Sequence, residues 1–176
     1  TEHLTGAFAF AIYDPDHEKL FCARDHIGFK PFYYLSNSQL FIFSTEIKGI
    51  KAHPGIRLTE NETFIIDALM TLRSEKDKTF YNEVLRLPPA HQMEITPSGT
   101  RLKKYWELNP DFELKLSSEE AYVDAFKEKL QEAVECRLRS KYPIGAELSG
   151  GVDSSAIVGV AAKKCEINAF SHAIPE

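Results

Sequence analysis

The sequence predicts an α+β fold built on an antiparallel sheet in its N-terminal part, followed by the start of an α/β fold with a parallel sheet. Three observations support this prediction. Short apolar runs with a period of two recur through residues 7–44 and are separated by turn residues. A period of three to four residues marks a long helix after residue 117. The last part of the chain then reads as strand, loop, helix and strand, which is typical of a parallel sheet.

The composition is that of an ordinary globular chain. Its 176 residues are 43% hydrophobic and 27% charged, which excludes a disordered, collagen-like or wholly coiled-coil protein. The net charge of −5 is spread along the chain without a basic face, so we expect no nucleic-acid partner. No apolar run is long enough to cross a membrane and no secretion signal is present, so we expect no membrane association and a cytoplasmic location. The three cysteines match neither a disulfide framework nor a zinc pattern, and we expect reduced, buried thiols.

Four short strands are predicted at the start of the chain. Residues 7–13 alternate small and large side chains, as in a strand that packs closely on one face. Residues 19–23, 31–35 and 39–44 follow as three further strands. Because the connections are short, we expect an antiparallel sheet.

Helices and a hairpin follow these strands. Residues 46–52 predict a short helix, and residues 60–72 predict a second one whose apolar face comprises Phe64, Ile65, Ala68, Leu69 and Leu72. Residues 85–95 and 100–106 predict two more strands joined by a turn that contains Pro97 and Gly99. We expect the first domain to cover residues 1–108.

A linker is predicted at residues 109–116 and a second domain at residues 117–176. Ser117 and Glu120 have the spacing of a capping box at the start of a helix that continues to about Ser140, with Glu135 and Arg139 as a pair on its outer side. A strand is predicted at 168–174. The chain has no Met at position 1 and stops at Glu176, before a partner strand or crossover helix could follow this strand, so we expect an internal piece of a longer protein.

The strongest motif is Ser149-Gly150-Gly151-Val152-Asp153-Ser154-Ser155, which follows a predicted strand and precedes a helix rich in Ala and Val. Glycines let successive backbone N–H groups turn toward one centre, and the helix N-terminus adds free N–H donors at the same point. The serines add hydroxyl donors. The motif therefore predicts a site for a polyphosphate.

Asp153 fits such a site only with a divalent cation, because its carboxylate would otherwise repel phosphate. Mg²⁺ takes oxygen ligands from carboxylate and phosphate together, so we predict Asp153 as a metal ligand. The alternative is a plain turn capped by an aspartate before a helix. The full run of motif residues between a strand and a helix favours the phosphate site.

At these residues the sequence resembles the pyrophosphate-loop ATP pyrophosphatases, and more closely the asparagine synthetase family, which joins such a domain to a class II glutaminase. The segments 4–14, 23–34, 44–48, 87–91 and 105–106 resemble the later part of that glutaminase domain. The resemblance therefore implies the C-terminal part of a glutaminase domain at 1–108 and the start of an ATP-pyrophosphatase domain at 117–176.

The resemblance also implies a carbon–nitrogen ligase that uses ATP, aspartate and glutamine as small-molecule substrates, with a possible homodimer. ATP would adenylate the aspartate side chain, and ammonia from glutamine would then displace AMP. The residues that it implies for ATP and pyrophosphate binding are Leu148, Ser149, Gly150, Gly151, Val152, Asp153, Ser154, Ser155 and His172, the last through adenine. The catalytic cysteine of the glutaminase would lie upstream of Thr1, so we expect no catalytic residue within this chain and no activity of the piece alone.

Two alternatives stay open. Glu147 in the strand before the motif and the run 172–175 depart from the family pattern, so a related amide-forming enzyme of the β-lactam synthetase or peptide-cyclase type, or a scaffold without turnover, also fits the sequence.

Arg24 and Asp25 have the residue types of a carboxylate clamp, but their position at a turn favours a structural role. We expect the histidines, His26 among them, to be solvated.

Overall fold

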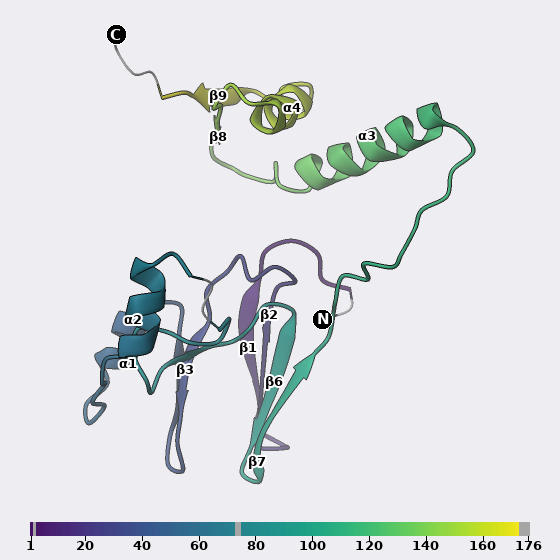
Figure 1. Cartoon of the computed structure of the whole chain (residues 1–176). Helices are drawn as coiled ribbons and strands as arrows, with labels where there is room; N and C mark the ends of the chain where they lie inside the picture. The colour runs from purple at the N-terminus through teal and green to yellow at the C-terminus, as the bar shows by residue number, and fades with distance from the viewer. Residues whose placement is uncertain (2, 73–74, 173–176) are drawn as a thin grey trace. The chain divides into compact units, whose positions relative to one another are not determined.

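The computed structural model describes residues 1, 3–72 and 75–172. The chain forms two compact units, Thr1–Pro110 and Asp111–Glu176 (Figure 1). The boundary between them falls inside the segment 109–116. None of the helices within the described ranges is long and apolar enough to span a bilayer.

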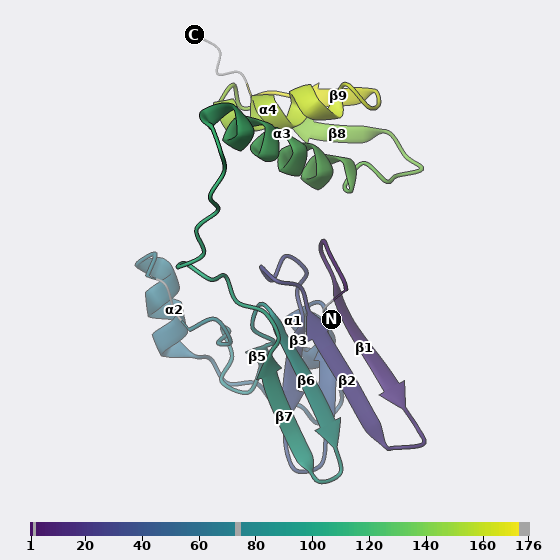
Figure 2. The ribbon, with the colours of Figure 1, turned by 90° about the vertical axis from the view of Figure 1, so that its right-hand side faces the viewer.

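The first unit contains a four-stranded antiparallel sheet with the strand order β1-β2-β6-β7. Figure 2 shows these strands side by side. They are β1 (Ala9–Asp14), β2 (Lys19–Arg24), β6 (His91–Thr96) and β7 (Gly99–Lys104). The small side chains of Ala9 and Ala11 pack against a buried cluster that includes Cys22 and Met93, which explains the alternation of small and large residues in this strand.

A second antiparallel sheet has the strand order β4-β3-β5 and comprises β3 (Tyr33–Ser36), β4 (Phe41–Ser44) and β5 (Leu85–Arg86). The early strands are therefore divided between two sheets, with β1 and β2 in the first and β3 and β4 in the second. Phe32, Tyr34 and Leu87 are buried in the same cluster as Cys22 and Met93 of the first sheet. This shared cluster is the main core of the unit.

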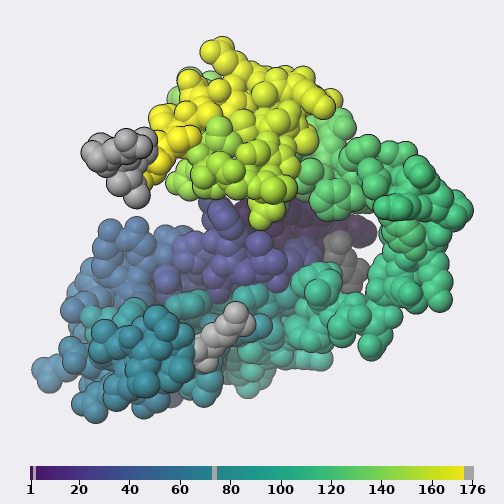
Figure 3. All heavy atoms as spheres, turned by 45° about the horizontal axis from the view of Figure 1, so that its top comes forward, coloured from purple at the N-terminus to yellow at the C-terminus, as the bar shows by residue number. Residues whose placement is uncertain are grey.

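Two helices complete the first unit. The helix α1 (Ile47–Lys51) buries Ile50 against Leu35 and Val84 of a second cluster, next to the β4-β3-β5 sheet. The helix α2 (Glu62–Leu69) begins at Asn61, whose side chain accepts a hydrogen bond from the Phe64 N–H at 3.1 Å. The predicted apolar face of α2 is only partly covered, since Leu69 is 80% exposed. In the space-filling view, the atoms of this blue-green segment lie at the surface (Figure 3).

The second unit contains α3 (Glu119–Glu135), β8 (Ile144–Glu147), α4 (Val152–Ala161) and β9 (Ile167–Phe170). The strands β8 and β9 pair in parallel, with Glu147 opposite Phe170, and α4 connects them. The predicted strand at 168–174 is thus shorter within the described residues, and positions 173–176 lie outside them.

The predicted limits of the long helix were wrong at both ends. Its N-cap is Ser118, which accepts from the Ala121 N–H at 3.2 Å, rather than Ser117. The helix stops at Glu135, so Arg139 does not lie one turn further along it. The Glu135 carboxylate instead pairs with the Lys164 Nζ at 2.8 Å, because the end of α3 lies against the segment that follows α4.

Candidate functional site

The predicted phosphate loop lies between β8 and α4. Leu148 still belongs to the sheet edge, because its N–H donates to the Phe170 carbonyl at 2.8 Å. Gly150 has φ = +81°, in the left-handed region that favours glycine. A Cβ at this position would meet no atom within 4 Å, so the requirement for glycine is one of backbone conformation rather than of space. Gly151 is the N-cap residue of α4.

Three hydrogen bonds of serine hydroxyls close this loop. The Oγ atoms of Ser149 and Ser154 lie 3.0 Å apart. The Gly151 N–H donates to the Ser149 Oγ at 3.4 Å, and the Ser154 hydroxyl donates to the Gly151 carbonyl at 3.2 Å. The loop is thus held by weak, exposed contacts, and an incoming anion can replace the hydroxyl that accepts from Gly151.

The N-terminus of α4 supplies further donors. No side chain caps it, and the first residues of a helix have N–H groups without intrahelical partners. Val152 and Asp153 form its first turn and are exposed, while the Ser155 N–H already donates to the Gly151 carbonyl at 3.1 Å. The predicted residues 148–155 therefore lie together at one end of the β8-α4 connection.

His172 lies two residues beyond β9 and is exposed. Its neighbour Ser171, which the sequence analysis did not single out, donates its hydroxyl to the Leu148 carbonyl at 2.8 Å. This bond brings the segment after β9 to the start of the loop. A polar residue directly after the second of two parallel strands is the signal that would have found Ser171.

The metal chemistry of the loop depends on a single carboxylate, that of Asp153. Among the described residues, no group of three or more His, Cys, Asp or Glu side chains could hold a metal ion. Mg²⁺ in nucleotide sites usually takes only one or two protein carboxylates and completes its shell with phosphate oxygens and water. One exposed aspartate in the first turn of a helix beside a glycine loop therefore fits a magnesium ion that arrives with a nucleotide.

Arg24 and Asp25 form a buried hydrogen-bond network with backbone groups of the first unit. The Arg24 guanidinium is buried and donates to the carbonyls of Lys30 at 2.6 Å, Leu87 at 2.7 Å and Gly28 at 2.5 Å. The Asp25 carboxylate, fully buried, accepts from the N–H groups of Phe29 at 2.8 Å and Lys30 at 2.9 Å. Burial alone would raise the pKa of Asp25, but these backbone hydrogen bonds outweigh burial and lower the pKa. The contacts agree with the structural role predicted for the pair.

The expectation of buried thiols and solvated histidines was wrong for several residues, since Cys165 and His91 are half-buried as well. Cys22 is buried, and burial raises its pKa to about 12, but Cys136 is exposed at the end of α3. His26 is half-buried, because its ring lies edge-on to Tyr105 at 5.4 Å and to Trp106 at 5.2 Å between ring centroids.

Both units of the chain match known protein families. Residues 1–106 match the glutamine amidotransferase domain model, and residues 125–176 match the asparagine synthase model. The chain belongs to the glutamine-hydrolysing asparagine synthetase family. In Bacillus subtilis (strain 168), asparagine synthetase (glutamine-hydrolysing) 3 is 36% identical to it over 162 residues, which cover 92% of this chain and 26% of that protein.

Other proteins that are similar to this chain have different names. Amidase chry2 of Gibberella zeae is 32% identical over 166 residues, covering 90% of this chain and 23% of that protein. A solved structure described as the allosteric regulatory enzyme of purine biosynthesis covers 97% of this chain and 32% of its own, at 14% identity and a TM-score of 0.37, too low for a shared fold to follow. The chain spans about a quarter of the curated relatives named here.

Proposed function

We propose that the full-length protein is a glutamine-dependent asparagine synthetase that adenylates the side chain of aspartate with ATP. The observation that carries this proposal is the order of the two family matches along one chain, with the loop 149–155 inside the second match. Residues 1–108 would be the later part of a class II glutaminase domain, and residues 117–176 the start of an ATP-pyrophosphatase domain. The boundary of the compact units after Pro110 supports a linker at 109–116.

The glycine loop would hold the outer phosphates of ATP. In this role the Gly150 and Gly151 amides and the first turn of α4 direct N–H donors at the anion, and Ser149, Ser154 and Ser155 add hydroxyls. The left-handed conformation of Gly150 supports this role, since it turns the backbone without a side chain in the path of the phosphate.

Asp153 would hold the magnesium ion that accompanies the nucleotide, and the ion would offset negative charge on the phosphates. His172 would contact adenine, and the hydrogen bond from Ser171 to Leu148 supports a position close to the loop. The ammonia would come from glutamine hydrolysed at a glutaminase site whose cysteine lies outside this chain. A homodimer and a cytoplasmic location stay predictions.

Release of pyrophosphate in the full-length protein tests this proposal. We expect the Asp153→Ala variant to lose aspartate-dependent pyrophosphate release about a hundredfold or more, a loss of the size seen when a group that stabilises transition-state charge is removed. Asp124→Ala is the matched control, because Asp124 is an exposed residue of α3 outside the loop, and its carboxylate pairs with Lys127 of the same helix at 3.5 Å. Normal release by Asp153→Ala would contradict the metal-ligand assignment.

A second candidate is an enzyme of the same kind that activates another carboxylic acid. The relatives named amidase and the carboxylate of Glu147 beside the loop favour it. A panel of carboxylic acids in the same assay separates the two candidates. Release with aspartate alone supports the synthetase, and release only with other acids supports the second candidate.

A further inference from the structure

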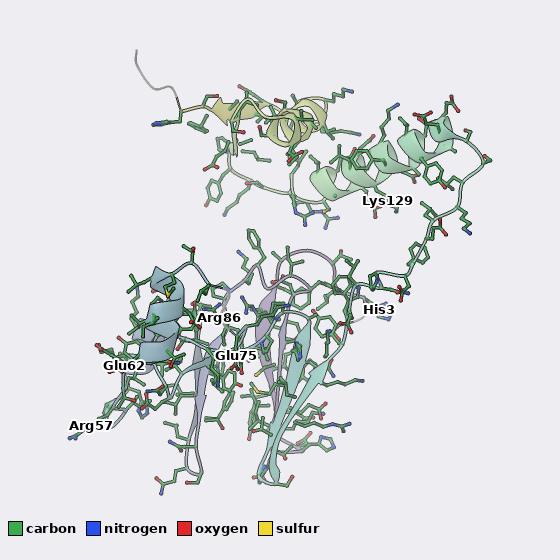
Figure 4. The ribbon with its side chains drawn as sticks, in the orientation of Figure 1. His3, Arg57, Glu62, Glu75, Arg86 and Lys129 are labelled. Carbon is green, nitrogen blue, oxygen red and sulfur yellow. The ribbon has the colours of Figure 1, made fainter. Side chains whose placement is uncertain are left out.

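The first unit contains an open cavity of about 660 Å³ that the reaction proposed above does not use. Among the residues that the structure describes, Arg24, Lys76 and Arg86 line it together with one carboxylate, that of Glu75. Phe64 and Pro89 contribute apolar wall. Figure 4 labels Arg86 and Glu75, which come from β5 and from the segment after α2. The described lining therefore carries more Lys and Arg side chains than carboxylates.

Arg86 is the unusual member of this set. Its side chain forms no hydrogen bond or ion pair with any described residue, and its buried Nε–H has no acceptor. Its guanidinium lies over the ring of Tyr33, 5.6 Å from the ring centroid, which holds it in place. A buried Nε–H without an acceptor is unfavourable, and an anion that enters the cavity can pair with this guanidinium.

The charged neighbours of Arg86 in the cavity do not provide a hydrogen-bond acceptor for its guanidinium. Arg24 directs its donors to three backbone carbonyls, and its own charge repels Arg86. Glu75 is largely exposed and lies 3.9 Å from the Lys78 Nζ. The cavity therefore places one guanidinium with free donors beside a second, fixed guanidinium.

We propose that this cavity binds a small carboxylate with a short apolar chain, whose carboxylate group pairs with Arg86. A planar carboxylate matches the fork of a guanidinium, and the apolar wall formed by Phe64 and Pro89 suits a hydrocarbon chain better than the oxygen atoms of a phosphate. The negative charge of the carboxylate also offsets the repulsion between Arg24 and Arg86. This inference does not depend on the role proposed for the loop 149–155.

Titration of the full chain with sodium propionate, and separately with inorganic phosphate, tests this assignment. The readout is the side-chain ¹⁵N resonance of Arg86 together with the dissociation constant. We expect saturable 1:1 binding of propionate, and at least tenfold weaker binding by Arg86→Gln. Arg101→Gln is the matched control, because Arg101 is exposed on β7 and does not line this cavity; its affinity should equal that of the unmodified chain.

The proposal is overturned by the absence of a saturable shift of the Arg86 resonance, by binding of phosphate without binding of propionate, or by equal affinity in Arg86→Gln. Near-UV circular dichroism checks that this variant is folded. Should it unfold, Arg86→Lys retains the charge without the planar fork, and we expect it to bind propionate several-fold more weakly. Unchanged affinity in Arg86→Lys would also overturn the proposal. Because none of these readouts involves pyrophosphate release, failure here is distinct from failure of the synthetase proposal.

Discussion

Replacing Gly28 by alanine should destabilise the first unit strongly, for two separate reasons. Gly28 has φ = +70°, and an alanine in this left-handed region costs about 1–2 kcal/mol. Its Cβ would also lie 2.8 Å from the Pro89 Cγ and 3.0 Å from the Arg24 Cζ. Arg24 must then shift away from the three carbonyls that it binds, and each hydrogen bond from a charged group contributes about 1.5–3 kcal/mol. We expect a total loss of about 3–5 kcal/mol.

Gly55→Ala is the matched control for this prediction. Gly55 has φ = +87°, but a Cβ there would meet no atom within 4 Å, so only the conformational cost of about 1–2 kcal/mol applies. Urea unfolding of the chain measures both losses. The fluorescence of Trp106, the single tryptophan, follows the first unit, because its ring lies 5.2 Å from that of His26. Equal losses for the two variants would refute the role of close packing around Gly28.

Three further predictions concern single groups. The pKa of Asp25 is lowered from 3.8 in the folded chain, so its carboxylate stabilises the fold above about pH 4, and this stabilisation is lost as the pH falls through the folded pKa. The urea midpoint should therefore fall with pH in this range, and Asp25→Asn should flatten the profile. Iodoacetamide at pH 8 should alkylate the exposed Cys136 and leave Cys22 unmodified in the folded chain, as mass spectrometry of peptides would show, because burial keeps the Cys22 thiol protonated. Ser118→Ala should lower the stability of the second unit by about 1 kcal/mol and Ser117→Ala should not, as measured by thermal unfolding followed by circular dichroism at 222 nm. A larger loss for Ser117→Ala would instead support Ser117 as the N-cap of α3.

Local patterns predicted most elements because each depends on neighbours in sequence. The alternation in β1, the turn residues between β6 and β7, and the strand, loop and helix around Gly150 all follow from rules of period and backbone conformation. The position of Ser171 could not be predicted in this way. Its contact with Leu148 joins residues 23 positions apart through the parallel pairing of β8 and β9.

Residue order and local conformation were sufficient to predict the family, the antiparallel and parallel character of the two parts, and the turn at the glycine loop. Contacts between residues distant in sequence determine which sheet each early strand joins, where α3 ends, and which charged groups share a cavity. Arg86 and Arg24 lie 62 positions apart, and no periodicity relates them. Their juxtaposition arises because the core shared by the two sheets brings the ends of β2 and β5 together, and burial then decides which charge has a partner.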